Sequence, residues 1–225
     1  QSNAELGVIP RGTGSDFCRT LKIPLSLTGA VTKLRNGVVR RMDVGKIHFI
    51  NHNSKEDARY FVNTASFGLS GRVAGKVGTS SKALGGTVAY ASATLQSVFK
   101  YNHPEVSIQY DEQTPRRLRI LTVVIANGPS FGGGMRIAPE AKLNDGILDV
   151  IIIGDLSTPE ILLNTHKLYT GGVLSVDKVA FTPAKKIQAW PVDSKEEVQL
   201  EVDGEAPGRL PASFEIVPSA LSVRC

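Results

Sequence analysis

Three short stretches of this sequence combine residue types that could bind a nucleotide, hold a cation and move a proton. The first contains Gly12, Thr13 and Gly14, followed by Ser15 and Asp16. Two glycines let the backbone approach a ligand closely, while the Thr13 hydroxyl and nearby amides can contact it. Asp16 is placed to cap a following helix, whose N-terminus favours phosphate. The pattern is neither a Walker A loop nor GxGxxG, so an ordinary strand-to-helix turn is the alternative.

The second stretch, PEAKLNDGILDV, contains Asn144, Asp145 and Gly146, a combination typical of a hairpin turn. A loop carboxylate flanked by backbone carbonyls is also how a hard cation such as Mg²⁺ is held, so Asp145 is a candidate ligand and Asp149 a candidate helper. Just upstream, SFGGGMRIAP has three successive glycines. They tolerate positive φ angles or the close passage of a ligand, and a β-bulge or wide turn is the alternative.

The third stretch, VQLEVDGEAPG, ends an alternating strand pattern on Asp203, Gly204 and Glu205. Two carboxylates at a glycine turn can divide the work of holding a metal and taking a proton from a hydroxyl. A surface hairpin with solvated carboxylates is the alternative. Elsewhere, His48 and His52 fall in a strand-and-loop segment and do not predict a metal pair, and no Ser-His-Asp set can be assembled.

The composition is that of an ordinary globular protein. The chain has 225 residues, of which 41% are hydrophobic and 21% charged, enough for one large domain or two small ones. No apolar run approaches the ~20 residues of a membrane-spanning helix. A net charge of +5 suits anionic partners such as nucleotides or acidic lipid headgroups, although dispersed basic pairs also fit solvated strand faces. Two distant cysteines indicate a reduced, cytoplasmic setting.

The elements that must position these stretches are mainly strands. Helical patterns occur at residues 16–21, 27–34, 86–101 and 159–170. Strand patterns occur at residues 6–9, 38–50 and 59–66, and then repeatedly from 105 to the C-terminus between proline, glycine and acidic turns. Many short antiparallel strands with few helices predict an α+β fold dominated by a β-sandwich or a curled sheet.

The order of four segments closely resembles the diacylglycerol kinase and sphingosine kinase-like superfamily of lipid kinases, especially its soluble bacterial members. The segments are LGVIPRGTGSDFCRTLKIP, VNTASFGLSGRVA, FGGGMRIAPEAKLNDGILDV and LEVDGEAPGRLPASFEIVPSAL. The resemblance covers residues 6–223. It implies a two-domain enzyme that binds ATP between an N-terminal α/β domain, carrying a GGDGT loop, and a C-terminal β-sandwich-like domain. The sequence contains no GGDGT.

The resemblance also implies roles for the first stretch. Thr13 matches the threonine that such enzymes place near ATP, with Gly12 and Gly14 shaping its turn and Asp16 beginning the next helix. Ser15 stands where many members have Asn. The strand at 6–9 then looks like a late strand of the nucleotide domain.

For the other two stretches the resemblance implies a metal site and a proton acceptor. Asp145 matches a ligand of a structural Mg²⁺, which the backbone carbonyls of Lys142 and Ile147 complete. Glu205 matches the residue that accepts a proton from the lipid hydroxyl, with Asp203 beside it.

The implied reaction is transfer of the ATP γ-phosphoryl group to a hydroxyl of diacylglycerol or a related lipid, with Mg²⁺, in the cytoplasm or peripherally at the inner membrane surface. Lipid and ATP are the expected partners, and nucleic acid is not. A NAD kinase-like enzyme with a soluble substrate and a non-catalytic lipid-binding module are the alternatives.

The sequence also suggests a division of the chain. Residues 1–4 have the character of an expression remnant, 5–24 form an orphan strand-turn-helix from the inter-domain nucleotide region, and 25–225 form the β-rich C-terminal domain. We expect this part of the enzyme to be inactive alone. An exposed strand at 6–9 could pair with a second copy and give a homodimer.

Overall fold

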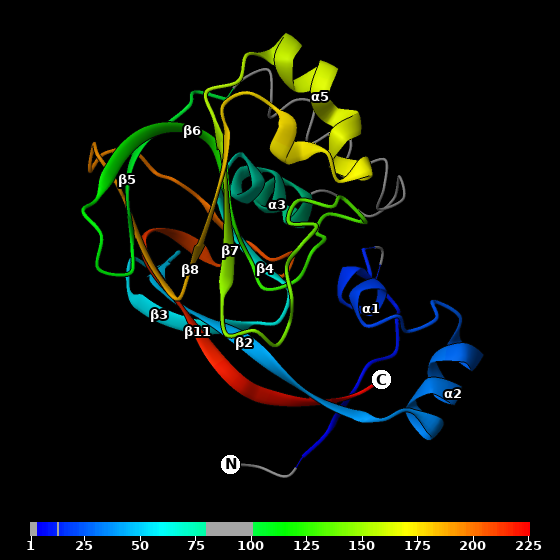
Figure 1. Cartoon of the computed structure of the whole chain (residues 1–225). Coiled ribbons are helices and arrows are strands. Elements are labelled where there is room, and N and C mark those ends of the chain that lie inside the picture. Colours follow the sequence, from blue (N-terminus) through cyan, green and yellow to red (C-terminus); the bar gives the residue numbers. More distant parts are fainter. Residues whose placement is uncertain (1–3, 13, 80–100) are drawn as a thin grey trace.

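The computed structural model describes residues 4–12, 14–79 and 101–225, whose strands form a strongly curved sheet (Figure 1). The strands are β1 (Leu6–Gly7), β2 (Val39–Asn51), β3 (Glu56–Phe61), β4 (Thr64–Gly68), β5 (Glu105–Tyr110), β6 (Arg116–Ala126), β7 (Leu148–Gly154), β8 (Val179–Ala184), β9 (Lys186–Pro191), β10 (Leu200–Val202) and β11 (Gly208–Arg224). The helices are α1 (Asp16–Thr20), α2 (Leu27–Asn36), α3 (Leu69–Thr79), α5 (Thr158–Thr170) and a short 3₁₀ helix, η2 (Val173–Ser175).

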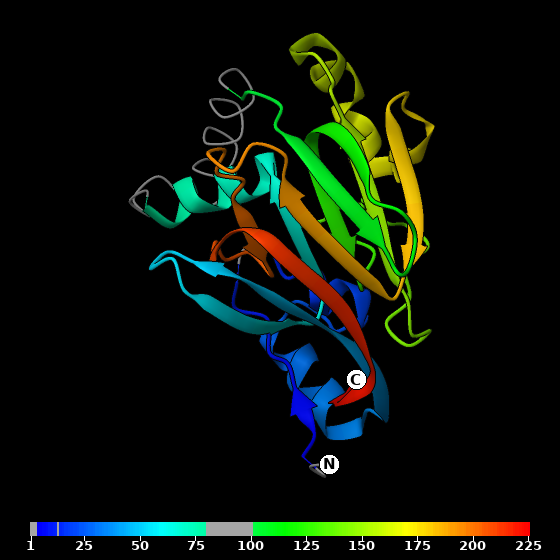
Figure 2. The same cartoon turned by 90° about the vertical axis from the view of Figure 1, so that its left-hand side faces the viewer.

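The sheet runs in the order β10-β4-β6-β5-β9-β11-β2-β3, with β7 and β8 branching from β6. Among the described strands every pairing is antiparallel except that of β1 with β11. Seen from the side, the strands curl around a common interior (Figure 2). The predicted α+β fold with a mainly antiparallel, sandwich-like sheet is therefore confirmed.

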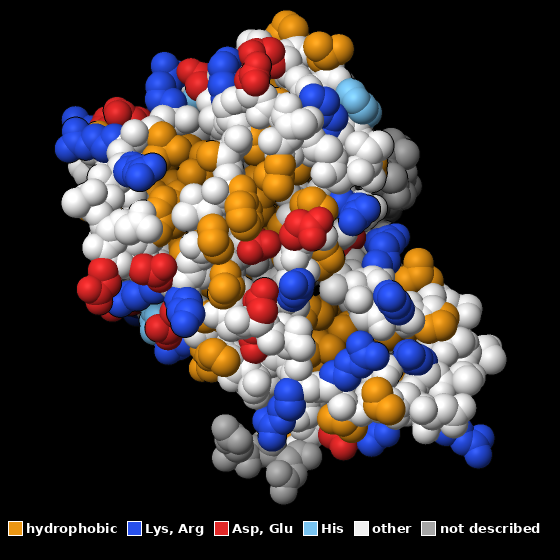
Figure 3. Space-filling view, in the orientation of Figure 1, with side chains coloured by type: hydrophobic (Ala, Val, Ile, Leu, Met, Phe, Trp, Pro, Cys, Tyr) orange, Lys and Arg blue, Asp and Glu red, His pale blue; other side chains and the backbone are white. Residues whose placement is uncertain are grey.

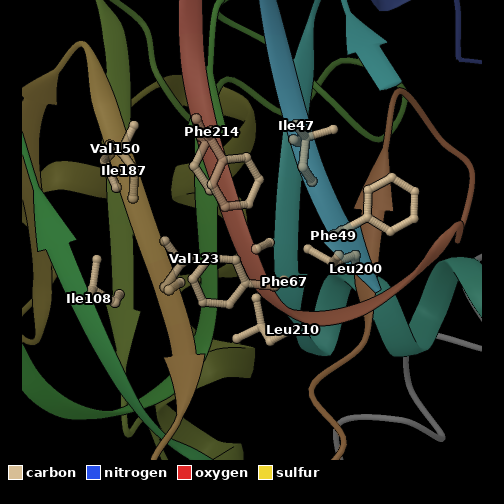
Figure 4. Close-up of a cluster of buried hydrophobic side chains, with 14 of the residues drawn as sticks. Ile47, Phe49, Phe67, Ile108, Val123, Val150, Ile187, Leu200, Leu210 and Phe214 are labelled. Atoms are coloured by element: carbon tan, nitrogen blue, oxygen red, sulfur yellow. The ribbon is translucent and has the colours of Figure 1, made fainter. Parts of the chain in front are cut away.

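The main hydrophobic core fills the inside of this curve. Figure 4 shows side chains from strands far apart in sequence meeting there, and the rings of Phe67 and Phe214 stack with centroids 6.2 Å apart. A second cluster lies where α3, η2 and α5 pack on β6 and β7, and includes Val73, Val124 and Ile151. A third, smaller cluster joins α1 and α2 to the ends of β2 and β11.

Local signals located several elements well. Ser26 caps α2 by accepting a hydrogen bond from the N–H of Gly29 at 3.3 Å. Ser157 begins α5 with a capping box, and Gly171 ends it in a left-handed conformation, φ 79°. Each of these caps depends only on residues within four positions of the helix end.

The strand predicted at residues 59–66 is in fact two strands, β3 and β4, separated at Val62 and Asn63. The separation arises because both backbone N–H groups bond to the distant carboxylate of Asp203, at 2.8 and 3.1 Å, rather than to a neighbouring strand. At the C-terminus one long strand, β11, pairs with β2, and its pairing is irregular near Pro218.

Helix α3 was not predicted, because its three glycines and Ser70 weaken the helical pattern. Packing requires the glycine at position 71, because a Cβ there would lie 2.2 Å from the carbonyl oxygen of Gln199. The helix predicted at 86–101 lies outside the described residues. No helix in the described part is long and apolar enough to cross a membrane.

The predicted strand at 6–9 is reduced to β1, in which Leu6 pairs with Val223 and Gly7 with Arg224 of the same chain. Residues 6 and 7 are therefore paired within the chain, while the origin predicted for residues 5–24 stays a prediction. The expectation of a homodimer loses the unpaired strand on which it was based.

Candidate functional site

The glycine-threonine turn and the triple-glycine loop lie against each other. The Asp16 carboxylate accepts a hydrogen bond from the backbone N–H of Gly133 at 2.8 Å. Arg19 holds the same carboxylate at 3.4 Å and donates to the carbonyl of Gly14. All three glycines of the loop, at positions 132 to 134, have positive φ angles, so the glycines are required for its path. Two backbone segments thus form a continuous surface.

The structure changes the predicted role of Asp16. Ser15, not Asp16, is the N-cap of α1, with a left-handed φ of 53°, and Asp16 is the first helical residue. Because α1 has five residues, its N-terminus contributes little of the positive potential expected from a longer helix. Gly12 and Gly14 lie in the turn as predicted, with the Ser15 hydroxyl donating to the Gly12 carbonyl at 3.1 Å. Thr13 lies outside the described residues.

The carboxylate of Asp203 is engaged by backbone rather than free to react. It accepts hydrogen bonds from the N–H groups of Val62, Asn63 and Thr64, at 2.8, 3.1 and 3.0 Å. Burial raises the pKa of Asp203 above its usual value, and the three backbone donors oppose this rise by favouring the ionised form. With φ angles of 46° at Asp203 and 92° at Gly204, the turn is tight and left-handed. Asp203 therefore fastens the turn that presents Glu205.

Glu205 lies at the surface of this turn. Its side chain is 73% exposed, and its carboxylate accepts a hydrogen bond from Arg59 of β3 at 2.7 Å. Sequence patterns gave no signal for Arg59, because 146 residues separate the two. The ion pair joins the Glu205 carboxylate to β3, whereas the carboxylate of Asp203, a residue that is also exposed, is bonded to backbone N–H groups.

A second acid, Glu201, is buried directly beneath the turn. It is 7% exposed and accepts hydrogen bonds of 2.5 Å from the Ser66 hydroxyl and from the N–H of Gly204. Burial raises the pKa of Glu201 to about 7; the two hydrogen bonds oppose this, and the negative charges of Asp203 and Asp16 add to it. Glu201 was not predicted, since it occupies an ordinary position in an alternating strand.

Asn63 joins the turn to the triple-glycine loop. Its side-chain amide donates to the Ser130 carbonyl at 2.7 Å, while its backbone N–H bonds to Asp203. Asn127, fully buried at the end of β6, donates to the carbonyls of Asp43 and Val62 at 3.0 and 2.8 Å. These buried amides bind the three predicted stretches into one assembly.

The loop around Asp145 is held from below by Asp43, which is 3% exposed. The Asp43 carboxylate accepts hydrogen bonds from the N–H groups of Gly146 and Ser219, both at 2.7 Å. The Asp145 carboxylate accepts the N–H of Ile147 at 3.2 Å. Since the described residues just before this loop form no strand, it is not the hairpin turn that was the alternative.

The donor set predicted for a metal fits a hard cation. Asp145 would contribute a carboxylate, and Lys142 and Ile147 would contribute carbonyl oxygens, which are ligands that Mg²⁺ accepts. The half-buried Asp149 has its pKa raised to about 6 by burial and then by the charges of Asp145 and Glu140, so negative charge gathers here. Within the described residues, no cluster of three or more acidic, His or Cys side chains could hold a metal by itself.

Two open hollows lie away from this assembly. One, of about 500 Å³, is lined by residues of β5, β9 and the turn after β5, and the other, of about 420 Å³, surrounds Trp190 and Pro211. Neither is lined by a residue of the three stretches.

Comparison with known proteins relates most of the chain to one family. Residues 63–225 match the model of the YegS C-terminal NAD kinase beta sandwich-like domain, and residues 1–47 match that of the Diacylglycerol kinase catalytic domain. Diacylglycerol kinases from Bacillus subtilis and Staphylococcus epidermidis are each 30% identical over 93% of this chain. The chain spans 65% and 62% of their lengths.

Solved structures agree with these matches. Two from Bacillus anthracis str. Sterne, both described as candidate diacylglycerol kinases, match this fold with TM-scores of 0.72 and 0.70 at 27% and 28% identity. Each match covers 98% of this chain and 68% of the other.

Proposed function

This chain belongs to the diacylglycerol kinase family through its β-sandwich-like domain, and from this premise we propose that the intact protein transfers the γ-phosphoryl group of ATP to a lipid hydroxyl. The observation that carries the proposal is the contact between the glycine-threonine turn and the triple-glycine loop through Asp16 and Gly133, beside the turn of Glu205. Backbone N–H groups and a carboxylate come together there, as phosphoryl transfer requires.

Glu205 is the residue we assign to the lipid hydroxyl. Its exposed carboxylate orients the hydroxyl and takes its proton as the phosphorus–oxygen bond forms. Arg59 directs this carboxylate through the 2.7 Å ion pair, and Asp203 holds the turn without taking part in proton transfer. This division follows from their surroundings, since backbone donors occupy the carboxylate of Asp203 and leave that of Glu205 accessible.

Asp145, with the carbonyls of Lys142 and Ile147, would hold Mg²⁺ in this proposal. The bound ion supplies positive charge that offsets the acidic groups of this loop. Asp43 keeps the loop in place by accepting the N–H of Gly146. The role of these residues is therefore to shape the surface next to the reacting groups.

A phosphoryl-transfer assay on the intact protein tests the proposal. Labelled ATP and Mg²⁺ are supplied with micelles of diacylglycerol, phosphatidylglycerol, ceramide or sphingosine, and with NAD as a soluble acceptor. Labelled lipid that is absent with Glu205→Gln would support a lipid kinase and identify its substrate. Transfer to NAD alone would favour the NAD kinase-like alternative.

The chain of 225 residues should show little or no turnover by itself. The reason is that the GGDGT loop, which the family resemblance places in the nucleotide site, does not occur in this sequence. Assaying the chain beside the intact protein measures the difference. Equal activity in both would show that the catalytic residues are all within these 225 positions.

A further inference from the structure

Asp43 and Glu201 are the two buried acidic residues in the described part of the chain, at 3% and 7% exposed. On the face drawn in Figure 3, by contrast, Asp and Glu side chains stand at the surface, where water solvates them. Burying an ionisable carboxyl group costs free energy that its hydrogen bonds must offset. The contacts of a buried acid therefore indicate what it does in the fold.

Glu201 holds the peptide of Gly204 from inside the fold. One oxygen of its carboxylate accepts a hydrogen bond from the N–H of Gly204, and the other accepts one from the Ser66 hydroxyl, both at 2.5 Å. Ser66 is fully buried and lies directly opposite Glu201 in the pairing of β10 with β4. The sheet thus fixes Ser66, and Ser66 fixes the carboxylate that holds the turn.

Gly204 is the position of the turn where such a contact matters most. The N–H groups of its neighbours have backbone partners: that of Asp203 bonds to the Thr64 carbonyl at 2.9 Å, and that of Glu205 to the Val202 carbonyl at 3.0 Å. Gly204 has a φ angle of 92°, and a Cβ there would meet nothing within 4 Å. A glycine in open space has no side chain to limit its rotation, so its hydrogen bond to the buried carboxylate supplies the restraint.

Rotation at Gly204 would move the carboxylate assigned to the lipid hydroxyl. On one side Asp203 is fixed by three backbone N–H groups, and on the other the side chain of Glu205 is 73% exposed. The Gly204 backbone is the joint between the fixed residue and the exposed one. Misplacing a reacting group by about 1 Å can cost roughly 100-fold in rate. Restraint of this joint therefore matters for the reaction.

The loop around Asp145 repeats the arrangement. Buried Asp43 accepts the N–H of Gly146 at 2.7 Å, and Gly146 directly follows Asp145, which is exposed. In both places a buried carboxylate holds the glycine next to an exposed acid that is proposed to act on a ligand. The two buried acids belong to different strands, β2 and β10. This recurrence argues against an incidental burial at either position.

We propose that Glu201 is a positioning residue for phosphoryl transfer, which places the Glu205 carboxylate by holding the peptide of Gly204. The inference rests on the proposed function, because that function makes Glu205 the proton acceptor. Glu201 lies beneath the turn and acts on Glu205 only through the backbone. Loss of its carboxylate should therefore slow the chemical step and leave ATP binding unchanged.

Steady-state kinetics of the intact protein test the inference. Glu201→Leu removes the acceptor at similar size, whereas Glu201→Gln keeps an oxygen for the Gly204 N–H and removes the charge. We expect Glu201→Leu to lower kcat by about 10–100-fold while the KM for ATP changes by less than about twofold. Glu201→Gln should restore kcat to within about threefold of the wild type, because the acceptor atom rather than the charge holds the turn.

The matched control is Thr122→Val in β6. Thr122 is 7% exposed, like Glu201, and its hydroxyl donates to the Phe67 carbonyl at 3.0 Å. This substitution removes a buried hydrogen bond of the same sheet without touching the turn. It should lower stability and leave kcat unchanged.

Exchange of the Gly204 amide with solvent gives a second measurement, which needs no catalysis. NMR of the 225-residue chain should show this amide protected in the wild type and in Glu201→Gln. In Glu201→Leu it should exchange roughly tenfold faster, because the hydrogen bond is lost. Ser66→Ala keeps the question answerable if Glu201→Leu misfolds. It frees one oxygen of the carboxylate, so it should speed this exchange and lower kcat about two- to fivefold.

Several results would overturn the inference. They are a normal kcat in Glu201→Leu, equal losses in Glu201→Leu and Glu201→Gln, the same loss in Thr122→Val, and unchanged Gly204 exchange in both Glu201→Leu and Ser66→Ala. Lipid phosphorylation by the wild type with a normal kcat in Glu201→Leu would reject the inference and leave the proposed function intact. No lipid phosphorylation by the wild type, with Gly204 exchange changing as expected, would contradict the proposed function and leave the restraint on the turn standing.

Discussion

Three acidic residues lie within five positions of the chain, yet their surroundings give them different roles. Asp203 is bound by three backbone N–H groups, Glu201 is buried beneath the turn, and Glu205 is exposed beside Arg59. A carboxylate acts on a substrate only where the protein leaves it accessible. The residue-level predictions follow from these differences.

Replacing Glu205 by Gln in the intact protein should lower kcat by about 10²–10⁴-fold, because the amide cannot accept the hydroxyl proton. The KM for ATP should change little, since ATP is not assigned to this side chain. Steady-state kinetics with the lipid identified above measures both. Glu112→Gln, in the exposed turn after β5, is the control, and a Glu205 variant with normal kcat would remove this residue from the mechanism.

Glu201 should make stability depend on pH. Burial raises its pKa from 4.5 to about 7, so the folded protein binds the proton more tightly than the unfolded chain. The stabilisation is fully present below about pH 4.5 and is lost as the pH rises through 7, a change on the order of 3 kcal/mol.

Glu201→Gln tests this dependence, because Gln keeps the shape and the acceptor for Gly204 but does not titrate. Denaturant unfolding at pH 5 to 8 should give a difference between variant and wild type that shifts in favour of the variant as the pH rises. Glu112→Gln should follow wild type. Parallel curves for wild type and the Glu201→Gln variant would exclude Glu201 as the source.

At the scale of elements, close backbone approach decides how the site is assembled. Helix α3 packs directly on the backbone before β10, and the loop around Asp145 is fastened to β2 through Asp43. The first contact depends on Gly71, where a side chain would not fit, and the second depends on Asp43, which accepts the N–H of Gly146. Substitutions there should affect the site through its support.

Gly71→Ala should destabilise the chain by about 1–3 kcal/mol, because its Cβ would lie 2.2 Å from a backbone oxygen that cannot move independently. Gly75 in the same helix is the matched control: the nearest atom to a Cβ there is the Cβ of Ala206, at 3.9 Å. Gly75→Ala should stabilise by about 0.5–1 kcal/mol, as expected for a helix interior. Denaturant unfolding of both variants and the wild type measures these changes in stability. A Gly71→Ala variant as stable as the wild type would contradict the close packing of α3 on the Gln199 backbone.

The loop of Asp145 should bind Mg²⁺ in the chain itself. Added Mg²⁺ should raise Tm by roughly 2–4 °C for each kcal/mol of binding free energy, and a chelator should reverse the change. Asp145→Asn should abolish the shift, whereas Asp177→Asn should retain it. An equal shift in both variants would place the ion elsewhere.

At the scale of the whole molecule, the curved sheet carries most of the buried apolar surface, and the α1–α2 region carries little. The main core draws on β2 to β11, whereas α2 has a single buried residue, Ala30. The site lies between these regions, since Asp16 of α1 contacts Gly133 near the sheet. We therefore expect the α1–α2 side of the site to unfold locally more easily than the side formed by the sheet.

Amides of α2 should exchange with solvent well before those of β4, β6 and β10. Hydrogen exchange followed by mass spectrometry measures the order directly. Exchange of α2 together with the central strands would mean that the molecule opens as one unit and would contradict this ranking.

The local features of this protein could be predicted from the sequence alone. Alternation located most strands, helical patterns located α2 and α5, and the order of the glycine and acidic turns identified the family. Each of these signals depends on neighbours within a few residues or on a motif in which side chains need not be placed. The division of the chain into residues 1–4, 5–24 and 25–225 stays a prediction.

The surroundings of the residues in those motifs depend on contacts between distant segments of the folded chain. The break between β3 and β4 is caused by Asp203, some 140 residues away, and the helix α3 is possible because Gly71 meets the backbone of Gln199. Glu201, Asn127 and Arg59 gained their roles from partners on other strands. The burial and the long-range hydrogen bonds of these polar side chains cannot be predicted from neighbouring residues, because they depend on how the sheet curves.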